Sequence, residues 1–274
     1  MELGTHQIEP TEEEIVAAEK LHAKGEHAAA LKLTQKMLER TNDGDSRMRL
    51  LFGVVSCSAF LELDEVTEQA MKELDTMPQP QCSRVLANLS RAYAEDQLGR
   101  PDKALAILDM NLETGYFERE DFRIHKYRLC LFKGQALVRL RRVTEALDWL
   151  DRAHAMYPSE DSARNEDERL IFCWVEPSIQ INRANCLLFL HRFDEAFDAA
   201  KQVAQRDNGD LATLARQYMA ESRVLLGRVP EALELYADLK KRLPCRLVQE
   251  DRIEQGITNC MNYLEKRRPT SKPS

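Results

Sequence analysis

Helical stretches, recognised by apolar residues at three- and four-residue spacing, alternate with short polar segments along most of the chain. Six of these polar segments are each followed by a small residue that opens a second helical stretch. The segments read KGEHAAAL, LDEVTEQA, GRPDKALA, RRVTEALD, HRFDEAFD and GRVPEALE. The small residues are Ala30, Val66, Ala104, Ala146, Ala196 and Ala232. Aligned on this position, the chain forms six frames of 34 residues, and each frame predicts two helices joined by a turn.

Other columns of the alignment agree with this division. Twelve positions before the small residue stand Ala18, Val54, Ala92, Gly134, Ala184 and Ala220. Small residues at these two positions let the two helix backbones approach closely. Gly25, Gly99 and Gly227 lie near the interruptions and suit the left-handed conformation that ends a helix. Because one helix pair cannot bury its apolar face alone, the pattern predicts an all-α solenoid of stacked antiparallel pairs.

These columns resemble the tetratricopeptide repeat, which has small residues at positions 8 and 20, glycine near 15, alanine at 27 and proline at 32. Residues 127–160 match best, with Gly134, Ala146, Ala153 and Pro158, and 213–246 match with Ala220, Gly227, Ala232 and Pro244. Position 4, often Trp in the family, departs from the pattern. The resemblance implies a right-handed superhelical solenoid of about six helix pairs.

The predicted organisation has four parts. An N-terminal extension at 1–10 precedes a solenoid at 11–246, which a capping helix at 247–267 and a disordered tail at 268–274 follow. The repeats are expected near 11–44, 47–80, 85–118, 127–160, 177–210 and 213–246. Two insertions lengthen the spacing, at Thr114–Phe122 and Pro158–Pro177. Glu166–Trp174 is expected to extend the following helix backwards, with Pro177 interrupting or restarting it. Plain loop lengthening is favoured over a specificity element for both insertions.

Composition limits the function classes. The formal net charge is −7. The chain has no apolar run of membrane-spanning length, and its acidic start lacks a signal core, so a cytoplasmic protein is expected. The seven cysteines form no CxxC pair and are interpreted as reduced thiols in the core. A basic stretch between Glu118 and Glu145 is the one candidate for nucleic-acid binding, and a solvated helix face is the favoured interpretation.

No motif for catalysis or cofactor binding is present. The sequence has no GxxxxGK, GxGxxG, HExxH or GxSxG segment. The six histidines show no partner at metal-ligand spacing, and His27 and His191 fall in predicted turns, where solvent exposure is expected. We therefore expect no enzyme activity, no cofactor, no metal and no small-molecule ligand.

In the tetratricopeptide family the first helix of each repeat lines a concave groove that binds peptides. The resemblance implies that the following residues line such a groove here: Arg128, Leu131, Gln135, Arg139, Asn182, Asn185, Phe189, Tyr218 and Glu221. The amides Gln135, Asn182 and Asn185 are the strongest candidates, because an amide offers a donor and an acceptor to an extended chain. The residues that clamp a terminal carboxylate in chaperone-binding members are matched here by Asn182 alone, which disfavours that activity.

The expected function is a non-catalytic scaffold or adaptor that binds a protein or peptide. The alternative is a dedicated regulatory or inhibitory subunit that sequesters one enzyme, toxin or transcription factor. Nucleic-acid binding through Arg119–Arg142 is a distant third hypothesis, which would require strongly salt-dependent affinity.

Overall fold

A computed structural model describes residues 9–23, 25–77, 81–206, 209–245 and 247–266. The tail expected at 268–274 lies outside the described residues, as does the extension expected at 1–10 except for its last two residues. The described part contains thirteen α-helices, three short 3-10 helices and one isolated β-bridge between Cys245 and Val248. The prediction of an all-α fold is confirmed.

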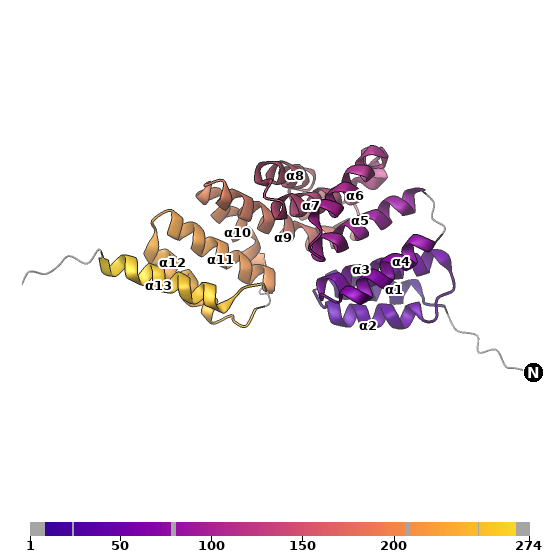
Figure 1. The fold of residues 1–274 in the computed structure, drawn as a ribbon, viewed down its shortest axis with the longest axis horizontal. Coiled ribbons are helices and arrows are strands. Elements are labelled where there is room, and N and C mark those ends of the chain that lie inside the picture. Colours follow the sequence, from indigo (N-terminus) through magenta and orange to yellow (C-terminus); the bar gives the residue numbers. More distant parts are fainter. Residues whose placement is uncertain (1–8, 24, 78–80, 207–208, 246, 267–274) are drawn as a thin grey trace, which may run out of the picture. The chain divides into compact units, whose positions relative to one another are not determined.

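The helices follow one another as hairpins with short turns (Figure 1). Their bounds are α1 Glu12–Ala23, α2 His27–Leu38, α3 Gly44–Phe60, α4 Asp64–Thr76, α5 Gln81–Gln97, α6 Pro101–Glu113, α7 Arg123–Arg139, α8 Val143–Met156, α9 Glu166–Phe189, α10 Phe193–Arg206, α11 Asp210–Leu225, α12 Val229–Lys240 and α13 Glu250–Lys266. The 3-10 helices are η1 Tyr116–Glu118, η2 Glu120–Phe122 and η3 Glu160–Ser162.

The chain forms two compact units. Unit 1 comprises residues 1–142 and 152–175, and unit 2 comprises 143–151 and 176–274. In unit 1, α1 packs against α2, α2 against α3, α3 against α4, and α5 against α6 and α7. In unit 2, α10 packs against α11, α11 against α12, and α12 against α13. Each unit is thus a stack of neighbouring helices, which is the tetratricopeptide-like arrangement that the sequence columns predict.

The same turn closes all six helix hairpins. A residue with positive φ stands two positions before each second helix: Gly25 (+81°), Glu62 (+58°), Gly99 (+74°), Arg141 (+62°), His191 (+60°) and Gly227 (+73°). The next backbone N–H then donates to the carbonyl five residues earlier, as in Arg100 N to Glu95 O at 2.8 Å and Arg142 N to Leu137 O at 2.9 Å. This is the Schellman geometry, which uses carbonyls that a helix end leaves without donors.

Aromatic rings fill the core of unit 1 beside the second insertion. The ring centroids of Tyr127 and Tyr157 lie 4.8 Å apart, and Tyr127 also stacks with Phe172 at 6.4 Å. The guanidinium of Arg123 lies over the Tyr157 ring at 4.3 Å and donates to the Met156 carbonyl at 2.7 Å. Buried aromatic surface and a desolvated cation–π contact together anchor the end of α8 to the start of α7.

Both insertions contain ordered elements. The first forms η1 and η2, and the second forms η3 and the first turns of α9. The helix begins at Glu166 as expected, but it runs through Pro177 to Phe189 without restarting there. Proline in a helix interior removes one backbone hydrogen bond, and the packing of α9 outweighs that loss.

The last helix of unit 2 packs on α12 through a close backbone approach. Ile253 and Cys260 of α13 are buried together with Tyr236 and Leu239 of α12. A Cβ atom placed on Gly256 would lie 2.5 Å from Cζ of Tyr236, so the phenol ring occupies the space that any larger residue would need. Helices meet this closely only where a side chain is absent at the crossing point.

Most of the cysteines are core residues, as expected, but Cys173 and the half-buried Cys245 are exceptions. Cys57, Cys130, Cys186 and Cys260 are buried free thiols, whereas Cys173 on α9 is exposed. The side chain of Cys82 lies outside the described part of the structure.

Candidate partner-binding surfaces

Three first helices present side-chain pairs four residues apart, which places each pair on one helix face. The pairs are Gln135 with Arg139 on α7, Asn185 with Phe189 on α9, and Glu221 with Leu225 on α11. Phe189 and Leu225 are large apolar side chains of the kind that usually fills a core, yet they are 49% and 54% exposed. Each helix therefore offers a polar group followed, one turn later, by an exposed side chain.

On α7, Gln135 is partly exposed and makes no side-chain hydrogen bond to another described residue. The exposed Arg139 is bound at 3.0 Å to the buried carboxylate of Asp96 on α5. Burial raises the pKa of Asp96 to about 6, and the charge of Arg139 opposes this rise without cancelling it. Gln135 thus keeps its donor and acceptor, whereas Arg139 is engaged within its own unit.

Two predicted groove residues of α7 differ from expectation. Leu131 is 1% exposed and belongs to the core, so it presents no surface to a partner. This corrects its inclusion in the groove set: the position faces the groove in the family pattern, but here the neighbouring helices cover it. Arg128 is partly buried over the Phe132 ring at 5.8 Å, and burial lowers its pKa to about 10. Its Nε atom has no partner among the described residues.

On α9, the two asparagines differ in what they offer. Asn182 Nδ2 donates to the Ser178 carbonyl of the same helix at 2.8 Å, which uses one of its donors locally. Asn185 is partly exposed and makes no side-chain hydrogen bond within the described residues. Asn185 is therefore better placed than Asn182 to bind an incoming backbone.

On α11, Glu221 is the centre of a small polar network. It accepts from Gln217 Nε2 at 2.7 Å and from Arg252 of α13 at 3.3 Å. Tyr218 is partly buried, and burial followed by the charge of Glu221 raises its pKa to about 12, so the hydroxyl stays protonated. Tyr218 and Glu221 are thus fixed by their own unit, and Leu225 is the most exposed member of this helix's set.

The nine predicted groove residues divide between the two units. Arg128, Leu131, Gln135 and Arg139 belong to unit 1, whereas Asn182, Asn185, Phe189, Tyr218 and Glu221 belong to unit 2. Within unit 2 they come from α9 and α11. The predicted groove residues of unit 2 combine an available amide with exposed apolar side chains, whereas those of unit 1 do not.

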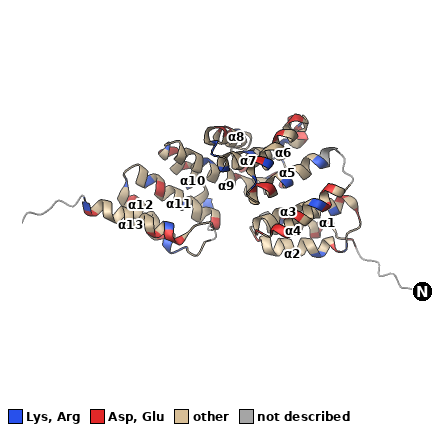
Figure 2. Ribbon diagram, in the orientation of Figure 1, with Lys and Arg blue, Asp and Glu red and all other residues tan. Residues whose placement is uncertain are grey.

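Half of the eight basic residues between Glu118 and Glu145 form ion pairs with described carboxylates. Lysine, arginine and acidic residues are interspersed along the helices in Figure 2. Arg119 pairs with Asp121 at 2.6 Å, Lys126 with Glu118 at 3.0 Å, and Lys133 with Asp109. These pairs, together with Arg139 and Asp96, reduce the positive potential that phosphate binding requires. They support the solvated-face interpretation of this stretch.

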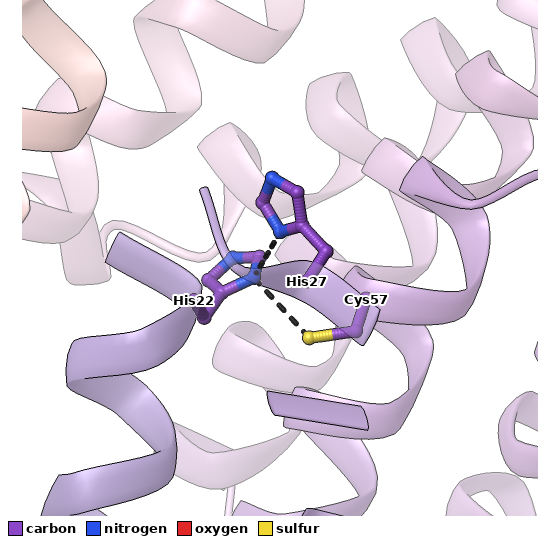
Figure 3. A group of neighbouring side chains, drawn as sticks. All are labelled: His22, His27 and Cys57. Atoms are coloured by element: carbon purple, nitrogen blue, oxygen red, sulfur yellow. Dashed lines mark hydrogen bonds between the residues drawn. The ribbon is translucent and has the colours of Figure 1, made fainter. Parts of the chain in front are cut away.

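The sequence interpretation of the histidines was wrong at one place. His27 was expected in solvent, but it is 6% exposed and lies beside His22 and Cys57 (Figure 3). The three come from α1, α2 and α3, so the group spans two repeats. One signal for it exists: His22 and Cys57 stand at positions 12 and 11 of adjacent frames, where first helices are neighbours.

No described helix is both long and apolar enough to cross a membrane. No family model matches the sequence, and no curated protein matches it.

Solved structures share its helical architecture at low similarity. A mutant form of MamA is 16% identical, with 73% of this chain and 99% of that chain covered and a TM-score of 0.47. The TPR2AB-domain:pHSP90 complex of yeast Sti1 is 14% identical over 91% of this chain and 97% of that chain, with a TM-score of 0.40. A thermophilic TPR protein of Thermus thermophilus is 18% identical over 91% and 98% of the two chains, with a TM-score of 0.36. Likenesses this low carry no information about a shared partner, and the names of the last two refer to the repeat family that the sequence columns resemble.

Proposed function

We propose that this protein is a non-catalytic cytoplasmic scaffold that binds an extended segment of another protein on the first helices of unit 2. Asn185 supplies hydrogen bonds to the backbone of the segment, and Phe189 and Leu225 supply apolar contacts to its side chains. The available amide of Gln135 on α7 offers the same hydrogen bonding within unit 1.

The observation that carries the proposal is the exposure of large apolar side chains in unit 2. Seven such residues are exposed among the described residues, and five of them lie in this unit: Phe189, Leu225, Leu247, Met261 and Tyr263. Phe189 and Leu225 hold the same repeat position on α9 and α11, each one turn after a polar residue. A repeated exposed apolar position is typical of an interaction surface, whereas scattered apolar residues need no such explanation.

The test is selection from a displayed peptide library with the purified wild-type protein. We expect enrichment of a sequence motif and binding of the matching synthetic peptide. The double variant Phe189→Ala/Leu225→Ala should weaken this binding by about 30- to 900-fold, because each of the two truncated anchors costs about 1–2 kcal/mol. The matched control is Leu63→Ala/Met110→Ala, which removes two exposed apolar side chains from unit 1.

The outcomes separate the candidate functions. Equal loss in both double variants, or none in either, would remove the unit 2 surface from the proposal. If the selected peptides share no motif but a single native protein forms a tight one-to-one complex, the regulatory-subunit alternative replaces the general scaffold. If the protein cleaves or modifies a bound peptide in these experiments, the proposal that it is non-catalytic is wrong.

A further inference from the structure

Two histidines and a cysteine of unit 1 converge where α1, α2 and α3 meet; we refer to them as the His–His–Cys cluster. His22 lies in the last turn of α1, His27 is the first residue of α2, and Cys57 is buried on α3. The turn at Gly25, with φ of +81°, brings His27 back beside His22. In Figure 3 one nitrogen of His22 lies between His27 and Cys57 and contacts both.

The atoms that would bind a metal are already close together. His22 Nδ1 lies 2.9 Å from His27 Nδ1 and 3.2 Å from Cys57 Sγ. All three ligand atoms lie within 4.8 Å of one another. In a tetrahedral zinc site with ordinary bond lengths, two nitrogens are about 3.3 Å apart and a nitrogen and a sulfur about 3.6 Å apart. The two gaps at His22 therefore need to open by about 0.4 Å, whereas the ligand atoms of His27 and Cys57, which lie within 4.8 Å of each other, need to reach about 3.6 Å.

We propose that the His–His–Cys cluster binds one thiophilic d¹⁰ metal ion, Zn²⁺ or Cu⁺, through His22 Nδ1, His27 Nδ1 and Cys57 Sγ. Two imidazoles and one thiolate form the donor set that these ions prefer, whereas Ca²⁺ and Mg²⁺ require oxygen ligands. Three protein ligands leave one tetrahedral position for water around Zn²⁺.

The protonation states determine which protons metal binding has to displace. Burial, followed by the neighbouring His27 and Arg128 charges, lowers the pKa of His22 to about 3, so its imidazole is neutral at physiological pH. Burial raises the pKa of Cys57 to about 12, so the free thiol keeps its proton. Metal binding must release the thiol proton of Cys57. It must also displace the proton shared by the Nδ1 atoms of His22 and His27, which moves to Nε2 of the ring that carries it.

The surrounding charges influence which ion is preferred. Arg128 of α7 adds positive charge near His22, and Glu19 of α1 partly offsets the charge of Arg128. A thiolate with Cu⁺ gives a neutral centre, whereas a thiolate with Zn²⁺ leaves one positive charge in this environment. The aromatic ring of Phe60, whose centroid is 3.8 Å from that of His27, orients the imidazole and limits access of water.

The competing explanation is a purely structural cluster. In that case the hydrogen bond between His22 and His27 and the contact with Cys57 satisfy buried polar atoms without any ion. The two explanations differ in what happens when metal is added to the protein.

The test uses the full-length protein, reduced and freed of metal with a chelator. Zn²⁺ and Cu⁺ are titrated separately in competition with chromophoric chelators, and Co²⁺ is added as a spectroscopic substitute for zinc. We expect one equivalent to bind, with a thiolate-to-cobalt charge-transfer band in the near ultraviolet. Cys57→Ser should abolish that band, and Cys57→Ser and His22→Ala should each weaken binding by at least about tenfold.

Cys186→Ala is the matched control, because Cys186 is an equally buried thiol in unit 2 outside the cluster. It should leave both stoichiometry and band unchanged. Circular dichroism establishes that each variant is folded, and Cys57→Ser keeps the size of the side chain. Absence of stoichiometric binding of either ion to folded wild-type protein, or a band that persists in Cys57→Ser, would overturn the proposal and leave the structural cluster.

Discussion

Arg164 Nη1 donates to Glu120 Oε1 at 2.6 Å, and this bond joins the two insertions that interrupt the repeat. The same guanidinium binds the buried carboxylate of Glu168 on α9, and the Arg164 backbone N–H donates to that carboxylate at 2.9 Å. Burial alone would raise the pKa of Glu168, but these contacts outweigh it, and the pKa is lowered. The insertions thus form one ordered substructure of unit 1.

Arg164→Ala should destabilise unit 1 clearly more than Glu120→Ala does, because it leaves the Glu168 carboxylate buried without its cation. Glu120→Ala removes the exposed end of the same network and should cost less than about 1 kcal/mol. Urea unfolding at neutral pH measures both. Equal effects of the two variants would contradict the argument that the buried Glu168 carboxylate needs the cation of Arg164.

Gly99→Ala should destabilise the protein by about 1 kcal/mol through backbone strain alone. Gly99 has φ of +74°, and a Cβ atom there would meet nothing within 4 Å, so crowding makes no contribution. Gly44→Ala is the control, because Gly44 also has open space around it but lies in the first turn of α3 without positive φ. Thermal unfolding should separate the two variants. Arg141 also has positive φ, which glycine adopts without strain, so Arg141→Gly should raise the melting temperature.

Arg206→Ala should cost about 3 kcal/mol at pH 7, since its partner Glu176 is buried in unit 2. Burial already raises the pKa of Glu176, and removing the cation raises it further. The variant's deficit should therefore shrink as the pH falls and Glu176 takes up a proton. Arg192→Ala, which breaks an exposed pair with Glu195, should show only a small change at pH 7.

Asp96 should make the protein less stable as the pH rises from about 4 to 6. Its pKa is about 6 in the folded state, above its ordinary value. The folded state therefore keeps the proton at pH values where the unfolded chain releases it, and the resulting stabilisation is lost as the pH rises through about 6. Asp96→Asn should remove about 2 kcal/mol of this pH dependence. Unfolding free energies of wild type and variant at pH 4 and 7 test the difference, with the exposed Asp198→Asn as control. A parallel pH response of wild type and Asp96→Asn would contradict the assignment.

The helix pairs were predictable because small residues and turn glycines recur at a fixed period. Gly25, Gly99 and Gly227 identify three of the turns in the sequence, and their positive φ angles confirm that prediction. Glu62, Arg141 and His191 adopt the same conformation without any compositional sign of it. In those turns the packing of the two helices imposes a geometry that the local residue does not favour.

The candidate site was less predictable, because its members depend on contacts between distant segments. Family register placed Leu131 in a groove, but neighbouring helices bury it. Arg139 was expected to be available to a partner, but it is bound to Asp96 of the preceding repeat. His27 was expected in a turn, where exposure is the usual outcome, but it begins α2, and its burial follows from the packing of α3 against α2.

The contact between Gly256 and Tyr236 makes the C-terminal end of unit 2 sensitive to a single methyl group. A side chain at position 256 would push α13 away from α12 and uncover Tyr236, Leu239 and the apolar face that now contacts Ile253. Such a face has the shape and polarity of the surface on which one helix pair stacks on the next. The missing side chain at this one position thus allows α13 to keep that face covered.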